Sequence, residues 1–288
     1  MMDFDFERPS TVKQACEILG KFEGKAKIIA GGTDLLVNLR SGSRGTQDTR
    51  MLVDISGISG LDTIEVKDGQ VRLGPMVTHE QVSCSSLLEE TASFLPAACR
   101  MVGSLQIRNR GTVGGNICNA SPSADSVPPL VAMDAKLRLF SGAKGERVMP
   151  LCDFITGSYH TALLQDEMIT EVFFSVPKGA KTAVVKLGRR KALSIARMSV
   201  AVMAVTEGGK VKLLSIVPGA VTPSPMRIKA AEEILLGKSP DANSIDMAAR
   251  TVAGEMLRLT GKRWSTSYKE PVIQVLVKRA LKQALEVK

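Results

Sequence analysis

Aromatic residues are scarce in this 288-residue chain, which has one Trp, two Tyr and eight Phe. Proteins that bind single-stranded nucleic acid stack bases on aromatic side chains, and these are few. The net charge of +9 comes from basic residues that are scattered along the chain instead of clustered in one helix or arm. We therefore expect no nucleic-acid binding, and interpret the charge as a solvated surface whose field attracts a phosphorylated ligand or an acidic partner.

Cysteine pairs are also missing. The five cysteines are far apart and form no C-x-x-C motif: Cys16, Cys84, Cys99, Cys118 and Cys152. This pattern excludes a disulfide framework and a self-contained iron–sulfur or zinc site, and it indicates a reducing compartment. His79 has no Cys, Asp or His close by in the sequence, so a cap or packing role is expected for it and metal binding is not.

The chain has no apolar run of about eighteen residues, the length that a membrane-spanning helix needs. Its first residues, Met-Met-Asp-Phe-Asp-Phe-Glu, are acidic where a signal peptide is basic. We expect a cytoplasmic protein without a membrane span.

Motifs of self-sufficient catalysis are absent too. No Ser-His-Asp set, carboxylate pair or G-x-G-x-x-G stands out, and Gly237-Lys238-Ser239 is not a P-loop because Glu232 occupies the position of the first glycine. No side chain is predicted to be catalytic. A protein of this kind leaves the chemistry to a bound group.

Two domains are expected from the length, with a turn-forming linker at Pro177–Lys181. Before the linker, strand and helix patterns alternate, with a helix expected over 87–102. After it, three strands suit an antiparallel sheet, at 183–187, 200–206 and 211–217. Helical patterns follow at 225–236, 244–259 and 271–286. The prediction is an α+β fold.

Two glycine-containing stretches follow apolar segments, at 28–35 (Ile-Ile-Ala-Gly-Gly-Thr-Asp-Leu) and 108–125. Glycine reaches positive φ and lets a ligand touch the main chain. Converging N–H groups and a helix start then bind an anion. The stretches read as a cradle for a phosphorylated ligand, in which a side chain at Gly32 or Gly114 would take the ligand's place. Tight turns between strands remain the alternative.

Ala30-Gly31-Gly32-Thr33-Asp34-Leu35-Leu36, together with Arg108 to Asn116 and Ala120 to Asp125, resembles the FAD-binding medium subunit of the molybdenum hydroxylases, the xanthine dehydrogenase family. The resemblance continues through 154–177, 186–201 and 219–238 and so covers nearly the whole chain. It implies a two-part FAD-binding domain of the PCMH type at 1–177. A C-terminal domain of the carbon monoxide dehydrogenase flavoprotein type, a three-stranded antiparallel sheet with helices, is implied at 182–288.

The resemblance also implies the cofactor, FAD, and the residues that bind it. The first stretch would cradle the pyrophosphate with its main-chain amides, and the second would do so from the other side. Asp125 would hydrogen-bond the cofactor, Leu163 or Leu164 would pack on a ring, and Lys186 would approach FAD. From the residues alone, Asp125 reads as a helix N-cap and Lys186 as a surface strand residue. The cofactor-binding set is Ile28, Ile29, Ala30, Gly31, Gly32, Thr33, Asp34, Leu35, Thr112, Val113, Gly114, Gly115, Asn116, Asp125, Leu163, Leu164 and Lys186.

By the same resemblance, the chain would be an oxidoreductase subunit in a hetero-oligomer. A molybdopterin-binding large subunit would oxidise the substrate, and a [2Fe-2S] small subunit would pass electrons to FAD and on to NAD+ or another acceptor. Ala30 to Asp34 differs from the Gly-Gly-His-Ser form of carbon monoxide dehydrogenases, so carbon monoxide is not the expected substrate. A stand-alone FAD-dependent oxidoreductase and a cofactor-free scaffold subunit are the alternatives.

Overall fold

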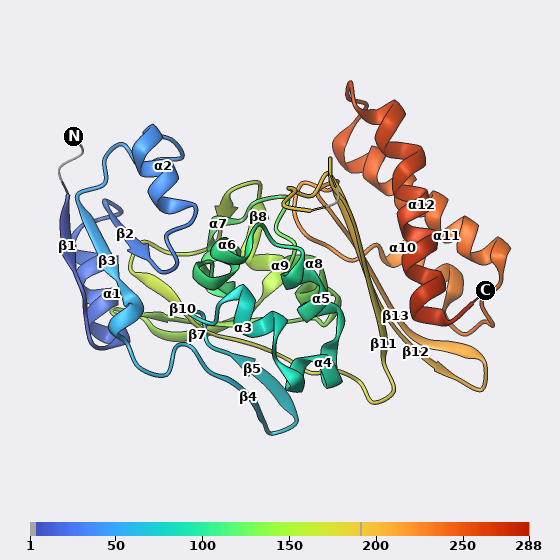
Figure 1. Cartoon of the computed structure of the whole chain (residues 1–288), viewed down its shortest axis with the longest axis horizontal. Helices are drawn as coiled ribbons and strands as arrows, with labels where there is room; N and C mark the ends of the chain where they lie inside the picture. Colours follow the sequence, from blue (N-terminus) through green and yellow to red (C-terminus); the bar gives the residue numbers. More distant parts are fainter. Residues whose placement is uncertain (1–3, 191, 288) are drawn as a thin grey trace.

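The computed structural model describes residues 4–190 and 192–287. Three parts follow one another along its longest axis (Figure 1). The first part is a small parallel sheet of order β1-β3-β2 with two helices. Its elements are β1 (Asp5–Glu7), α1 (Val12–Lys21), β2 (Ala26–Ile29), α2 (Leu35–Ser41), β3 (Met51–Asp54) and the 3₁₀ turn η1 (Ile55–Gly57).

The second part is a five-stranded antiparallel sheet of order β4-β5-β10-β6-β7 with short helices and a two-stranded ribbon. Its strands are β4 (Ile64–Lys67), β5 (Gln70–Leu73), β6 (Lys136–Ser141), β7 (Gly145–Pro150), β8 (Ile155–Gly157), β9 (His160–Thr161) and β10 (Glu167–Phe174). Its helices are α3 (His79–Ser83), α4 (Ser86–Ala92), α5 (Phe94–Arg100), α6 (Leu105–Arg110), α7 (Val113–Asn119), α8 (Val127–Ala132) and α9 (Leu151–Phe154).

The third part confirms the expected three-stranded antiparallel sheet with helices, and with it the α+β class. Strand β12 lies at the centre, and the helices cover one face of the sheet (Figure 1). The elements are β11 (Lys181–Leu187), β12 (Met198–Glu207), β13 (Lys210–Gly219), α10 (Lys229–Leu235), α11 (Ala242–Thr260) and α12 (Thr266–Leu285).

Strand β12 joins the C-terminal sheet to the rest of the chain because both of its faces are buried. Val200 and Val202 point toward the helices and belong to their core, while Ala201 and Met203 belong to the core of the second part. Successive strand residues point to opposite faces, so seven consecutive apolar or small residues suit a strand with packing on both sides. The two cores therefore share one sheet.

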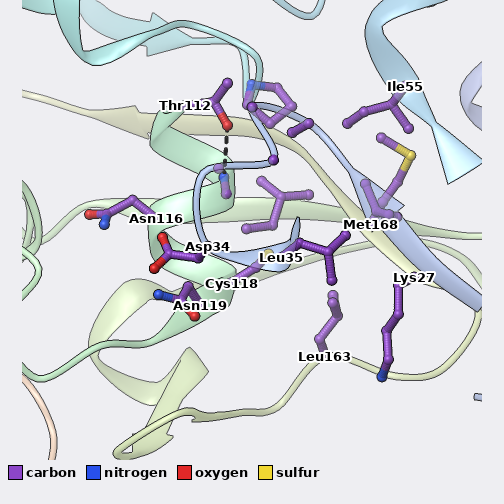
Figure 2. A pocket seen from close by; sticks show the side chains of 18 of the residues that line it. Lys27, Asp34, Leu35, Ile55, Thr112, Asn116, Cys118, Asn119, Leu163 and Met168 are labelled. Carbon is purple, nitrogen blue, oxygen red and sulfur yellow. Dashed lines mark hydrogen bonds between the residues drawn. The ribbon is translucent and has the colours of Figure 1, made fainter. Parts of the chain in front are cut away.

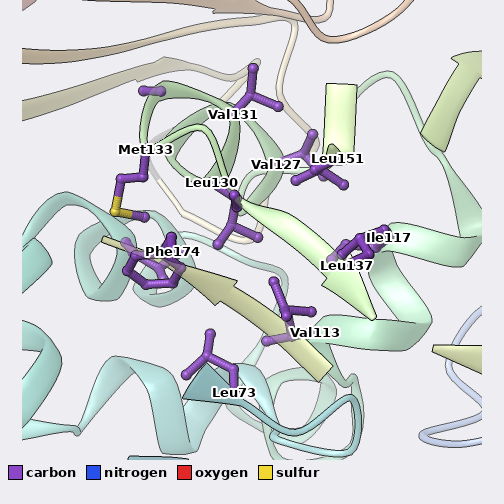
Figure 3. Close-up of a cluster of buried hydrophobic side chains, with 14 of the residues drawn as sticks. Leu73, Val113, Ile117, Val127, Leu130, Val131, Met133, Leu137, Leu151 and Phe174 are labelled. Carbon is purple, nitrogen blue, oxygen red and sulfur yellow. The ribbon is translucent and has the colours of Figure 1, made fainter. Parts of the chain in front are cut away.

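The core of the second part lies under the second glycine stretch. Val113 and Ile117, one turn apart on α7, pack among Leu73, Leu137 and Phe174 (Figure 3). This contact fixes α7 on the five-stranded sheet, because side chains four residues apart share a helix face.

Helix boundaries differ from the expectation in several places. Helix α10 begins at Lys229 instead of 225, and α12 begins at Thr266 instead of 271. The helix expected over 87–102 is two helices, α4 and α5, which meet at Ser93. The second stretch was expected to be a loop at Thr112–Asn116, but Val113 to Asn119 form helix α7, with Thr112 as its N-cap. Thr112 accepts a hydrogen bond from the Gly115 N–H at 3.1 Å, the interaction that favours Thr at this position.

Candidate functional site

A cavity of about 540 Å³ lies between the first and second parts of the fold. This size falls in the range of small-molecule and cofactor sites. Its wall contains residues of both glycine stretches, of α2 and of the β9–β10 connection. Figure 2 shows Asp34, Asn116 and Asn119 together on one side, with Ile55, Leu163 and Met168 on the other. The cavity therefore has a polar end and a mainly apolar end, which Lys27 also borders (Figure 2).

The first stretch leaves strand β2 and turns into α2. Gly32 has φ +74°, in the left-handed region that glycine adopts without strain. The N–H groups of Gly31 through Leu35 have no acceptor among the described residues, whereas the next one, Leu36 N–H, donates to the Gly32 carbonyl oxygen. Five successive unpaired N–H groups at a helix start form a site for an anion such as a diphosphate.

The second stretch uses its amides differently. The Val113 and Gly114 N–H groups donate to the carbonyl oxygens of Val77 and Pro75, at 2.8 and 2.9 Å. The Gly115 N–H donates to the Thr112 hydroxyl, and the Asn116 N–H donates to the Thr112 carbonyl oxygen. The expected main-chain role of 113–116 is therefore corrected. Their amides are bound within the protein, so the N–H groups free to meet an anion are those of the first stretch.

The glycines of the two stretches serve close packing more than positive φ. A Cβ built on Gly31 would lie 1.9 Å from the Arg110 carbonyl oxygen, so this glycine lets the two stretches touch. A Cβ on Gly114 would lie 2.6 Å from Pro75 Cβ, which is protein and not ligand space. A Cβ on Gly115 would meet only the Thr112 hydroxyl within 3 Å. The expectation that a side chain at Gly114 would take the ligand's place is therefore wrong, although Gly114 itself lines the cavity.

Thirteen of the seventeen predicted residues line the cavity. They are Ile28, Ala30, Gly31, Gly32, Thr33, Asp34, Leu35, Thr112, Gly114, Gly115, Asn116, Leu163 and Leu164.

Four predicted residues lie off the wall, namely Ile29, Val113, Asp125 and Lys186. Val113 is fully buried in the core because it shares a helix face with Ile117. Ile29 lies beside Gly32, where its Cδ1 would be 3.5 Å from a Cβ on that glycine. Strand and helix geometry turn these two side chains toward protein.

Asp125 and Lys186 pair with each other behind the wall. Lys186 Nζ is 2.7 Å from Asp125 Oδ2 and donates to the Met101 carbonyl oxygen at 2.8 Å. Both side chains are at least nine-tenths buried. The residues alone had suggested a helix N-cap for Asp125 and a surface strand position for Lys186, and both interpretations are wrong. Ser126 is the N-cap of α8, and Lys186 is buried.

The Asp125 carboxyl has an unusual environment. Burial raises its pKa to about 6, and the neighbouring Lys186 ammonium opposes that rise. Its Oδ1 atom is buried and has no hydrogen-bond partner among the described residues. Met101, whose carbonyl oxygen binds Lys186, directly precedes Val102 on the cavity wall. Met101 therefore connects the Asp125–Lys186 pair to Val102 of the cavity wall.

Sequence reasoning missed several wall residues. His79 was expected to be a cap or a packed residue; it begins α3 and is 2% exposed, yet it also lines the cavity. Its Nδ1 lies 3.6 Å from Cys99 Sγ, and burial together with Arg108 lowers its pKa to about 4. Lys27, Asn38, Val102 and Ile107 are other missed wall residues. No pattern in the sequence marks them, because they reach the wall only through packing.

Among residues 4–190 and 192–287, no group of three or more His, Cys, Asp or Glu side chains is placed to hold a metal ion. Over the same residues, no helix is both long and apolar enough to cross a membrane.

Comparison with known proteins agrees with this geometry. Residues 2–178 match the FAD binding domain in molybdopterin dehydrogenase, and residues 183–284 match the CO dehydrogenase flavoprotein C-terminal domain. The chain is 30% identical to the xanthine dehydrogenase FAD-binding subunit of Escherichia coli O157:H7, over 99% of this chain and 97% of that one. It is also 30% identical to the carbon monoxide dehydrogenase medium chain of Hydrogenophaga pseudoflava, over 98% and 96%.

Solved structures agree as well. A carbon monoxide dehydrogenase from Hydrogenophaga pseudoflava that lacks the Mo-pyranopterin moiety of the molybdenum cofactor superimposes with a TM-score of 0.92 and 28% identity, covering 99% of this chain and 98% of that one. The carbon monoxide dehydrogenase from Oligotropha carboxidovorans gives 0.92 and 26%, with full coverage of both. With both parts matched in order, this chain belongs to the FAD-binding oxidoreductase subunits of the molybdenum hydroxylase, or xanthine dehydrogenase, family.

Proposed function

We propose that this subunit accepts electrons from iron–sulfur clusters of a small partner chain and passes them to NAD+ or another acceptor. A molybdopterin-binding large subunit would oxidise the organic substrate in the same complex. One observation supports FAD binding at this site above all others. Among the described residues, the five N–H groups of Gly31 to Leu35 are unpaired, and they lie on the wall of a cavity of about 540 Å³. FAD can hold one or two electrons, so it links single-electron donors to a hydride acceptor.

The chain's own residues bind and orient the cofactor in this proposal. The amides of the first stretch hold the diphosphate, with Thr33 and Thr112 supplying hydroxyl groups beside it. Gly115 on the wall leaves room for the ligand, since apart from the Thr112 hydroxyl a Cβ there would meet no protein atom closer than 4.0 Å. Leu163 and Leu164 exclude water from the apolar end. The remaining predicted residues of the two stretches, such as Ile29 and Val113, hold the main chain around the cofactor in position.

Asp125 and Lys186 are assigned to the end of the cofactor that lies toward the C-terminal sheet. The unpartnered Oδ1 of Asp125 supports this assignment, because a buried carboxylate oxygen without a donor is costly and a cofactor N–H or O–H would satisfy it. Lys186 would then hold the carboxylate in place through its 2.7 Å contact.

The organisation of the chain is part of the same proposal, with domains at 1–177 and 182–288. A cytoplasmic location is proposed too, supported by the free state of all five cysteines. Relatives named as subunits or medium chains of nicotinate, caffeine and carbon monoxide dehydrogenases support a multi-chain assembly.

Reoxidation of the reduced complex tests the electron path without knowledge of the substrate. The complex is purified through a tag on this chain, reduced anaerobically with dithionite and mixed with NAD+ or a dye acceptor, and oxidation of the partner's clusters is followed by electron paramagnetic resonance. We expect cluster oxidation that depends on FAD. A Gly31→Ala complex without FAD is the matched control for direct oxidation of the clusters by the acceptor. Clusters that stay reduced beside a reoxidised flavin would contradict the proposal.

A further inference from the structure

The excess of positive over negative charge comes from the C-terminal part of the chain. Residues 182–288 contain 19 Lys and Arg against 8 Asp and Glu, whereas residues 1–177 contain 17 against 21. The binding of FAD does not explain this asymmetry, because the FAD cavity lies in the N-terminal parts of the fold. A strong local field of one sign attracts a partner of the opposite sign.

Part of this charge gathers on one surface with exposed apolar side chains. The β11–β12 loop and the turn between α11 and α12 lie on the same side of the C-terminal sheet (Figure 1). Ile195 from the loop is 79% exposed, and Trp264 from the turn, the only tryptophan of the chain, is 91% exposed. Tyr268, at the start of α12, is 43% exposed. We call this surface, completed by the cations Arg197, Arg263 and Lys269, the Trp264 patch.

The cations of the Trp264 patch lie close to one another without acidic partners. The Arg197 guanidinium carbon lies 4.8 Å from the centre of the Tyr268 ring, which ties the loop to α12. Burial lowers the pKa of Lys269, and Arg197 and Arg263 lower it further by repulsion. Within residues 4–190 and 192–287, no carboxylate lies within 4.0 Å of any of these three cations. The patch therefore keeps an uncompensated positive field.

The Trp264 patch is also connected to the proposed cofactor contacts. The Arg197 N–H donates to the Leu187 carbonyl oxygen at 2.8 Å, and Leu187 directly follows Lys186 on β11. Lys186 in turn holds Asp125 behind the cavity wall. A chain seated on the patch would lie near the end of the cofactor that these two residues are assigned to.

We propose that the Trp264 patch docks an acidic surface of the iron–sulfur partner chain. This inference rests on the proposed function. Trp, Tyr and Arg dominate the binding energy of protein interfaces, and the patch combines all three. One Trp and one Tyr are too few to stack a nucleic-acid strand, which favours a protein partner. Complementary charge would steer the acidic chain to this site and fix its orientation.

Charge-reversal and truncation variants test the docking site in the tagged complex. The variants are Trp264→Ala, Ile195→Ser and Arg263→Glu, and the matched controls are Met247→Ala and Lys210→Glu, at exposed positions outside the patch. Retention of the iron–sulfur chain is measured against rising salt, together with the FAD content and the melting temperature of this chain.

We expect the patch variants to weaken retention of the iron–sulfur chain at least about tenfold, with FAD content and melting temperature unchanged. The control variants should behave as the wild type. Retention equal to wild type in all three patch variants overturns the docking site. A wild-type chain without FAD would instead contradict the proposed function, so the two failures are distinguishable.

A photo-crosslinking residue at position 264 identifies the contacted surface. We expect links to peptides of the iron–sulfur chain that are rich in Asp and Glu, lost at high salt, and absent when the crosslinker is at position 247. Links to RNA or lipid, or to peptides without acidic excess, overturn the proposal.

Discussion

Gly31 and Arg110 are in direct backbone contact, although they belong to different parts of the fold. A Cβ on Gly31 would lie 1.9 Å from the Arg110 carbonyl oxygen, so no side chain fits there. This contact closes the cavity between the first and second parts. It makes the geometry of the unpaired amides in the first stretch dependent on the second stretch.

Gly31→Ala should therefore separate the two stretches. We expect loss of FAD together with destabilisation of about 1–3 kcal/mol, the usual cost of an extra methyl group in a packed site. Released FAD and the midpoint of urea unfolding are the measurements. Gly254→Ala is the control, because its Cβ would meet nothing within 4 Å and Ala favours the helix. A Gly31→Ala chain with full FAD content would contradict the close-packing role.

Gly115→Ala and Gly114→Ala should have different effects. Gly115 lines the cavity, and a Cβ there would meet the Thr112 hydroxyl at 2.9 Å and no other atom closer than 4.0 Å, so we expect weaker FAD binding with a folded chain. The Gly114 side chain would collide with Pro75, so the expected effect is on stability first. FAD affinity by fluorescence titration and thermal unfolding distinguish the two. Equal loss of stability in both variants would refute the assignment of Gly115 to ligand space.

Asp125→Asn should change how stability varies with pH. Burial raises the Asp125 pKa from 3.8 to about 6, so the folded state holds the proton more tightly than the unfolded state. The stability from this group is fully present below pH 3.8 and is lost as pH rises through about 6, a change of about 3 kcal/mol. Measured on the chain without FAD, the stability of Asp125→Asn relative to wild type should therefore rise between these pH values. A constant difference would show that Asp125 does not titrate in this range.

His79→Gln should show the opposite sign. The folded-state pKa of His79 is lowered from 6.5 to about 4, so the unfolded state binds the proton more tightly. Wild-type stability from this group is present above pH 6.5 and is lost as pH falls toward 4, by about 3 kcal/mol. Urea unfolding from pH 4 to 7 should show His79→Gln gaining stability relative to wild type as the pH falls. A wild-type His79 ring that titrates near 6.5 by nuclear magnetic resonance would contradict this.

Much of the architecture could be predicted from local sequence. The three C-terminal strands and the helices after them follow from apolar periodicity and turn residues, because strand and helix patterns are local. The cofactor and the family followed from the resemblance of the two glycine stretches and their surroundings to a known family. Short helices such as α7 were missed, since Gly114 and Gly115 weaken a helix and only the Thr112 cap and the packing of Val113 and Ile117 stabilise it.

The sequence by itself determined which residues are small, apolar or hydrogen-bonding, and therefore that two glycine stretches exist and that positive charge gathers after residue 181. Tertiary structure alone decided which amides stay free. Within the part of the chain that the structure describes, the N–H groups of Gly31 to Leu35 lack acceptors, whereas those of Val113 and Gly114 donate to the carbonyl oxygens of Val77 and Pro75. The same holds for Asp125 and Lys186, which meet only because β11 lies beside α5 and the residues that follow it. Hydrogen bonds and ion pairs between segments far apart in the chain depend on packing, and no local pattern encodes them.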